Sequence, residues 1–115
     1  MKQELLFGAA YYPEYMPEDR IDTDFAMMRS AGINVIRIAE STWSTWEPEN
    51  GEFDFSLLLH TLDKALEYDL QVIVGTPTYA IPAWMAREHP DVMVQTPAEQ
   101  RRYGHRQYHD TMNPH

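Results

Sequence analysis

Charged and aromatic side chains interrupt and follow the apolar run at residues 33–39. Arg37 lies inside this run, Glu40 closes it, and Trp43 and Trp46 follow within six residues. Strands that are buried on both faces are usually almost continuously apolar, so these charges are unusual. An arginine fork and a carboxylate can hydrogen-bond hydroxyl groups, and an indole ring can stack on the C–H face of a sugar. This combination is typical of a site for a polyhydroxy ligand.

The same residues also fit purely structural roles. Arg37 and Glu40 are three residues apart at a strand end, so they could instead form an interior ion pair. The two tryptophans could be a sugar platform or simple packing at the rim of the fold. Glu14, which follows Tyr-Tyr-Pro, could contact a substrate or tie its own loop together. The sequence leaves these alternatives open.

A second candidate group lies in residues 103–110. No packing pattern explains Arg106, and an arginine fork beside acidic loops suits a sugar or a carboxylate. His105 and His109 are four residues apart and Asp110 follows, a spacing that resembles metal ligands. However, the segment has no helical periodicity and the chain has no cysteine. We therefore expect no metal and no cofactor.

Three apolar runs predict strands at residues 5–12, 33–39 and 71–76. One helix is predicted to start at Pro17 and to end before Gly32, and a second is predicted to start near residues 54–56. The predicted buried faces of these two helices consist of Ile21, Phe25 and Met28 and of Leu58, Leu62, Ala65 and Leu66. Strands that alternate with helices at this spacing predict consecutive βαβ units, which is an α/β fold with a parallel sheet.

After the third strand, prolines punctuate a long connection that leaves room only for a short helix at residues 83–88. All three tryptophans and Glu14, Glu40 and Glu47 follow predicted strands. In parallel α/β folds the loops after the strands meet at one face, where ligands bind. We therefore expect these side chains at one face.

Charge and composition exclude several kinds of partner. The net charge is −9, which argues against nucleic acid and against an anionic membrane surface. No apolar segment approaches the length of a membrane span, and the apolar stretch near the N-terminus is too short for a signal peptide. We expect a cytoplasmic protein.

Several spaced motifs occur in a fixed order along the chain. They are Tyr11-Tyr-Pro-Glu14, Val35-Ile-Arg-Ile-Ala-Glu40 with Trp43 and Glu47-Pro48, Gly51-Glu-Phe-Asp-Phe55, Val74-Gly-Thr-Pro-Thr78 with Pro82-Ala-Trp84, and Tyr103-Gly-His-Arg106. Together they resemble the start of a glycoside hydrolase family 42 β-galactosidase, and the resemblance runs essentially end to end.

The resemblance implies a (β/α)₈ TIM barrel that hydrolyses terminal non-reducing β-D-galactosides with retention, through one acid/base glutamate and one nucleophilic glutamate. It implies that Arg106 contacts the galactose and that Arg37 and Glu40 line the floor of the same pocket. Some family members hold zinc through a cysteine at the place of Asp110, so zinc is not expected here. Homotrimeric assembly is common in the family.

The length of the chain departs from the family pattern. A complete barrel needs about 250 residues, whereas this chain has 115. We therefore interpret residues 1–115 as an incomplete TIM-barrel catalytic domain with about three βα units. Both catalytic glutamates are expected beyond His115, so no residue here is assigned a catalytic role and the chain alone is expected to be inactive.

Two other functions remain open at this point. The chain could be a carbohydrate-binding module that performs no chemistry, or an interaction domain completed by another chain in a split barrel. Binding of galactose by a cooperatively folded monomer would favour the first, and co-purification with a second chain would favour the other.

Overall fold

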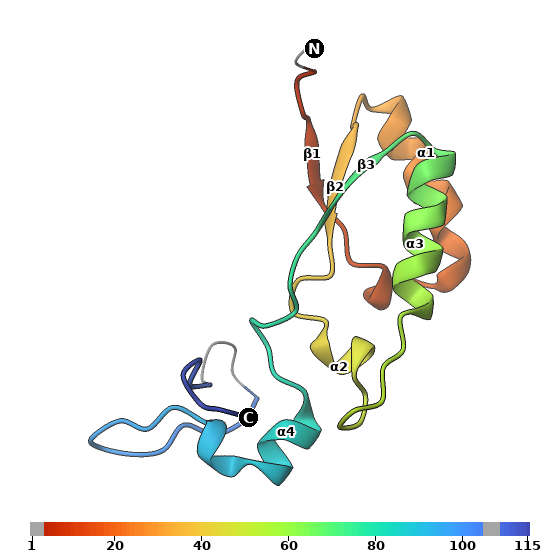
Figure 1. Ribbon diagram of the computed structural model, residues 1–115. Helices are drawn as coiled ribbons and strands as arrows, with labels where there is room; N and C mark the ends of the chain where they lie inside the picture. Colours follow the sequence, from red (N-terminus) through yellow and green to blue (C-terminus); the bar gives the residue numbers. More distant parts are fainter. Residues whose placement is uncertain (1–3, 105–108) are drawn as a thin grey trace. The chain divides into compact units, whose positions relative to one another are not determined.

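The computed structural model describes residues 4–104 and 109–115. Its helices and strands follow one another in the order shown in Figure 1. They are β1 (Gly8–Ala10), η1 (Pro13–Tyr15), η2 (Glu18–Arg20), α1 (Ile21–Ser30), β2 (Val35–Ile38), α2 (Trp43–Trp46), α3 (Ser56–Glu67), β3 (Gln71–Val74), α4 (Ala83–Glu88) and η3 (Pro90–Val92).

The three strands form one parallel sheet in the order β1-β2-β3. The predicted α/β fold with consecutive βαβ units is therefore confirmed. Each strand is three or four residues long, shorter than the apolar run that predicted it. The helix predicted at residues 83–88 is present as α4.

The described chain divides into two compact units. The sheet unit consists of residues 1–39 and 55–75, and the loop unit consists of residues 40–54 and 76–115. The sheet unit contains the three strands with α1 and α3, whereas the loop unit contains α2, α4 and η3.

The core of the sheet unit lies between the sheet and its two helices, which lie on the same side of the sheet in Figure 1. Ile36 and Phe25 are fully buried, and Ile21 and Ile38 are 2% exposed. Ile36 and Ile38 are two residues apart, so they point to the same face of β2. The predicted buried positions Ile21 and Phe25 of the first helix are confirmed.

The second helix buries a different set of side chains from the predicted one. Leu66 is 81% exposed, whereas Thr61 is fully buried. The Thr61 hydroxyl donates a hydrogen bond of 2.7 Å to the carbonyl of Leu57, so its burial leaves no polar group unsatisfied. Ala65 is buried as predicted, and Leu66 lies one residue further, about 100° around the helix. The prediction for Leu66 was therefore wrong.

A continuous apolar run such as residues 5–12 is typical of a strand that is covered on both faces, yet residues 5–10 are exposed. Leu5, Leu6 and Phe7 are between 52% and 85% exposed, and all three residues of β1 are exposed. In the described chain, β1 pairs with β2 along one edge only, and both helices lie on one side of the sheet. The apolar run shows that both faces of the strand can be buried. The described residues cover only part of this surface.

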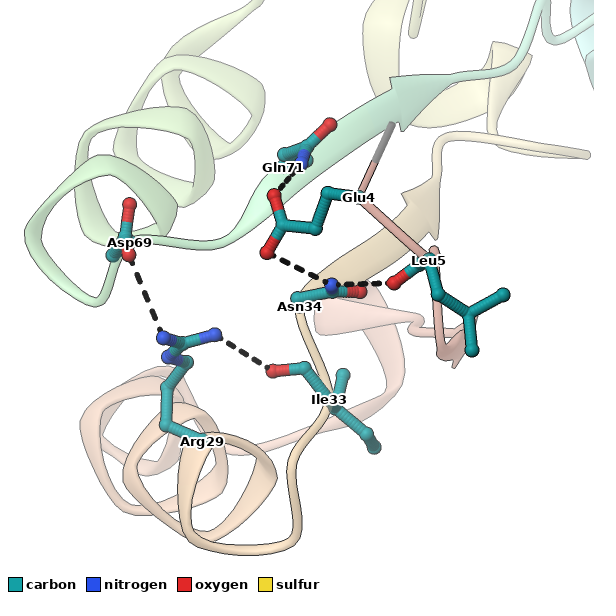
Figure 2. Close-up of polar contacts among 7 residues, drawn as sticks. All are labelled: Glu4, Leu5, Arg29, Ile33, Asn34, Asp69 and Gln71. Atoms are coloured by element: carbon teal, nitrogen blue, oxygen red, sulfur yellow. Dashed lines mark hydrogen bonds and ion pairs between the residues drawn. The ribbon is translucent and has the colours of Figure 1, made fainter. Parts of the chain in front are cut away.

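A polar network joins the amino ends of the strands, as Figure 2 shows. The Asn34 side chain accepts a hydrogen bond of 2.8 Å from the backbone N–H of Phe7 and donates one of 2.9 Å to the carbonyl of Leu5. It also donates to Glu4, whose other carboxylate oxygen accepts from Gln71 at the start of β3. One side chain therefore fixes the alignment of β1 against β2.

Replacing Asn34 with alanine in the complete protein is expected to lower the free energy of unfolding by about 0.5–1.5 kcal/mol. The substitution leaves the N–H of Phe7 and the carbonyl of Leu5 without this partner. Urea unfolding measures the loss. Asn50→Ala is the matched control, because the Asn50 side chain makes one exposed hydrogen bond of 3.3 Å to Glu88. Equal losses in the two variants would contradict the role of Asn34.

The loop unit has its own small core, made by Ile81, Trp84, Met85, Val92 and Met93.

None of the helices in the described part of the chain is long and apolar enough to cross a membrane.

Candidate functional site

Arg37 lies on the face of the sheet that α1 and α3 leave uncovered. It alternates along β2 with the buried residues Ile36 and Ile38, and its own side chain is exposed. In the sheet register Arg37 is level with Ala10 and Ile73. In the (β/α)₈ barrel that the sequence motifs lead us to expect, the helices form the outer ring, so the face that carries Arg37 is expected to face the barrel interior.

The backbone around Glu40 is strained on both sides. Ala39 has a φ of 76° and Ser41 a φ of 64°, which is the left-handed region that residues with a Cβ rarely adopt. Each such residue costs about 1–3 kcal/mol unless the surrounding structure holds it there, and such residues cluster at functional sites. Glu40 therefore lies two residues after β2, between two residues with unfavourable backbone conformations.

Glu40 lines a cavity of about 460 Å³ within the loop unit. The other lining residues carry hydroxyl groups or an imidazole and are Thr76, Thr78, Tyr79, His109 and Thr111. This volume is typical of small-molecule sites, which span about 300–1,000 Å³. Three threonine hydroxyls, a phenol, an imidazole and a carboxylate can together donate to and accept from a polyhydroxy ligand.

The lining residues other than Glu40 were not predicted from the sequence as site residues. Thr76 and Thr78 follow β3 directly, so their position after a strand was a usable signal. His109 was considered only as a metal ligand. Its backbone pairs with Met93 in an isolated bridge, and the neighbouring Asp110 N–H donates to the carbonyl of Val92 at 2.7 Å. These long-range contacts bring it to the cavity, and the sequence around it gives no hint of them.

Glu47 serves the packing of the loop unit. It is 8% exposed, and its two carboxylate oxygens accept hydrogen bonds from Trp43 Nε1 at 2.8 Å and from the Gly51 N–H at 2.9 Å. Its backbone carbonyl accepts a further bond of 2.8 Å from Trp84 Nε1. Trp84 is 5% exposed, so it packs in the core, whereas Trp43 is half-buried and has its ring fixed by Glu47.

Replacing Glu47 with alanine in the complete protein is expected to destabilise it by about 1–3 kcal/mol. Trp43 Nε1 and the Gly51 N–H both lose a carboxylate acceptor in a partly buried place. The melting temperature reports the loss. Glu49→Ala is the control, since Glu49 is exposed and makes a 3.4 Å ion pair with Arg87. A melting temperature for Glu47→Ala that is no lower than that for Glu49→Ala would contradict the structural role of Glu47.

Tyr11 and Glu14, both in the loop after β1, differ in their surroundings. Tyr11 is buried and donates from its hydroxyl to Asp24 at 3.0 Å, and this burial together with the Asp24 carboxylate raises the pKa of Tyr11. Glu14 is half-buried, and burial raises the pKa of its carboxyl group. Its Oε1 atom has no hydrogen-bond partner among the described residues.

Two of the residues singled out from the sequence, His105 and Arg106, lie outside the described residues. Among residues 4–104 and 109–115, no group of three or more histidine, cysteine or acidic side chains is placed to hold a metal ion.

The model of the family described as β-galactosidase, glycoside hydrolase family 42, matches residues 10–115. The chain belongs to this family. Two curated relatives are the β-galactosidase YesZ of Bacillus licheniformis, 37% identical over 99% of this chain, and a β-galactosidase of Thermus thermophilus, 33% identical over 95%. The chain spans 17% of the length of each of these relatives.

Solved structures of family 42 enzymes have the same fold over the length of this chain. The β-galactosidase of Rahnella sp. R3 aligns over 96% of the chain with a TM-score of 0.90 and 34% identity, and the chain covers 17% of it. The β-galactosidase of Halorubrum lacusprofundi aligns over 91% with a TM-score of 0.86 and 32% identity, and the chain covers 16% of that structure. The sheet and helices of this family 42 chain are thus the N-terminal βα units of a (β/α)₈ barrel.

Proposed function

We propose that the complete protein hydrolyses terminal non-reducing β-D-galactosides with retention of configuration. The observation that carries this proposal is the match of the family model to residues 10–115. In such a reaction one carboxylate attacks the anomeric carbon while a second carboxyl group, about 5–5.5 Å away, protonates the departing oxygen. Water then hydrolyses the glycosyl-enzyme. We assign neither carboxyl group to Glu14, Glu40 or Glu47.

The part of this reaction that we assign to the present chain is the binding of the galactosyl group. Glu40 lines a polar cavity of about 460 Å³, and Arg37 lies on the uncovered face of the sheet. Charge-assisted hydrogen bonds from an arginine or a carboxylate are the strong ones in sugar recognition. Arg106, which lies outside the described residues, is proposed as a third contact on the strength of the family resemblance.

Hydrolysis by the complete protein tests the activity directly. We expect release of 4-nitrophenol from its β-galactoside, with β-galactose as the first product seen by NMR. The β-mannoside is the matched comparison, because the exo-β-1,4-mannosidase Op5Man5 is similar in fold to 70% of this chain, with a TM-score of 0.60 and 30% identity. Faster hydrolysis of the mannoside, or α-galactose as first product, would contradict the proposal.

Cytoplasmic location, a role in carbohydrate metabolism and homotrimeric assembly remain proposals as well. Membership of the family is the observation that supports them. Sedimentation of the complete protein at several concentrations would establish its assembly state.

A further inference from the structure

A second, smaller cavity lies beside the cavity that Glu40 lines. It has a volume of about 160 Å³, and its apolar walls are Trp43, Ile81, Met85 and Val92. Three of these side chains belong to the buried core of the loop unit, and Trp43 packs against that core. An apolar protein cavity of about 150 Å³ can hold one benzene molecule. The small cavity is therefore large enough for one ring.

Three of the polar residues that line the small cavity, Asp110, Asn113 and His115, already make contacts within the loop unit. Asn113 donates to Asp91 Oδ2 at 3.0 Å and accepts from the His115 N–H at 3.1 Å. Asp110 Oδ1 accepts from the Met112 N–H at 2.9 Å. The His115 ring stacks on that of His89, with 3.9 Å between their centroids. With these three residues engaged, the surface that the small cavity offers to a ring is mainly that of Trp43, Ile81, Met85 and Val92.

The two cavities share part of their lining. Thr78, His109 and Thr111 border both the larger polar cavity and the smaller apolar one. A ligand with a hydroxyl-rich part and an apolar ring would match both cavities. Its hydroxyl-rich part suits the larger polar cavity, and its ring suits the smaller apolar one.

We propose that the small cavity binds the aglycone of the galactoside and selects apolar, ring-sized aglycones. This inference rests on the proposed function, in which the Glu40 cavity takes the galactosyl group. Met85 and Val92 then set the size of the aglycone that fits, because both line the small cavity only and neither borders the larger one.

The test compares phenyl with 2-naphthyl β-D-galactoside in the complete protein. Truncating Met85 in the variant Met85→Ala enlarges the cavity, so the ratio of kcat/KM for naphthyl over phenyl is expected to rise about tenfold. Val92→Ile adds one carbon to the wall and is expected to lower the same ratio about tenfold. Comparing ratios between variants cancels the different reactivities of the two leaving groups.

Met93→Ala is the matched control. Met93 is buried in the same core, but it does not line the small cavity. Its ratio is expected to stay within about twofold of the unmodified protein, since this truncation creates its space elsewhere. If Met85→Ala does not fold, the naphthyl-to-phenyl ratio of Val92→Ile alone tests the proposal.

The possible failures are distinguishable. Hydrolysis of both galactosides with an unchanged ratio in Met85→Ala and Val92→Ile would overturn the aglycone site and leave the proposed function standing. A similar rise in Met85→Ala and Met93→Ala would also overturn it. No hydrolysis of either galactoside by the unmodified protein would contradict the proposed function itself.

Discussion

The 115-residue chain by itself is expected to release no galactose from a β-galactoside. Retaining hydrolysis needs two carboxyl groups about 5–5.5 Å apart on either side of the scissile bond. Glu47 uses both of its oxygens to hold Trp43 and Gly51, and Glu14 Oε1 is buried. Three strands also supply fewer than half of the eight that close a barrel around a substrate.

The measurement is the rate of 4-nitrophenol release by the purified chain beside that of the complete protein at equal molar concentration. The rate with the chain is expected to equal the buffer blank. Turnover that is proportional to chain concentration and that survives further purification would contradict this expectation. It would require a catalytic pair among the carboxyl groups of the chain.

Replacing Arg37 with alanine in the complete protein is expected to lower kcat/KM for galactosides by about 10–150-fold. A hydrogen bond that involves a charged group contributes about 1.5–3 kcal/mol, and each 1.36 kcal/mol corresponds to a factor of ten in rate. In the complete protein this face of the sheet lies in the packed interior of the barrel, so a modest fall in the melting temperature is expected as well. Steady-state kinetics and thermal unfolding together check both expectations.

Arg87→Ala is the control for Arg37. Arg87 is an exposed arginine of α4 that makes a 3.4 Å ion pair with Glu49, and its removal is expected to leave kcat/KM within about twofold. If Arg37→Ala lowers stability strongly and leaves the kcat/KM of the folded enzyme unchanged, the interior ion pair considered in the sequence analysis is the better account.

The sheet and its helices could be predicted because their signals are local. Ile36 and Ile38 alternate with Arg37 along one strand, and Ile21 and Phe25 lie one helical turn apart. The prolines in the long connection after the third strand left room only for a helix at residues 83–88, and α4 lies there. Such patterns depend only on the geometry of one element.

The failures arise from contacts that the spacing of apolar residues does not reveal. Leu66 is apolar but exposed, whereas Thr61 is buried. The hydroxyl of Thr61 can be buried because it donates to the carbonyl of Leu57, and residue type alone does not indicate this. His109 reaches the Glu40 cavity through a backbone pairing with Met93, sixteen positions earlier in the sequence. Spacing along the chain does not encode such pairings.

The role of Glu40 was predicted from its place after a strand, but the strain beside it was not. Ala39 and Ser41 have side chains with no special preference for a positive φ, so nothing in their identity indicates the left-handed backbone. The turn after β2 is therefore imposed by the surrounding structure, and it is this turn that sets the position of Glu40.

A crystal structure of the complete protein with bound galactose tests the central claim most directly. That claim is that this family 42 chain supplies binding groups for the galactosyl part of the substrate. We predict hydrogen bonds to the sugar hydroxyls from the Arg37 guanidinium and the Glu40 carboxylate, and a further one from Arg106. Galactose bound at the active centre with none of these three side chains in contact would contradict the account.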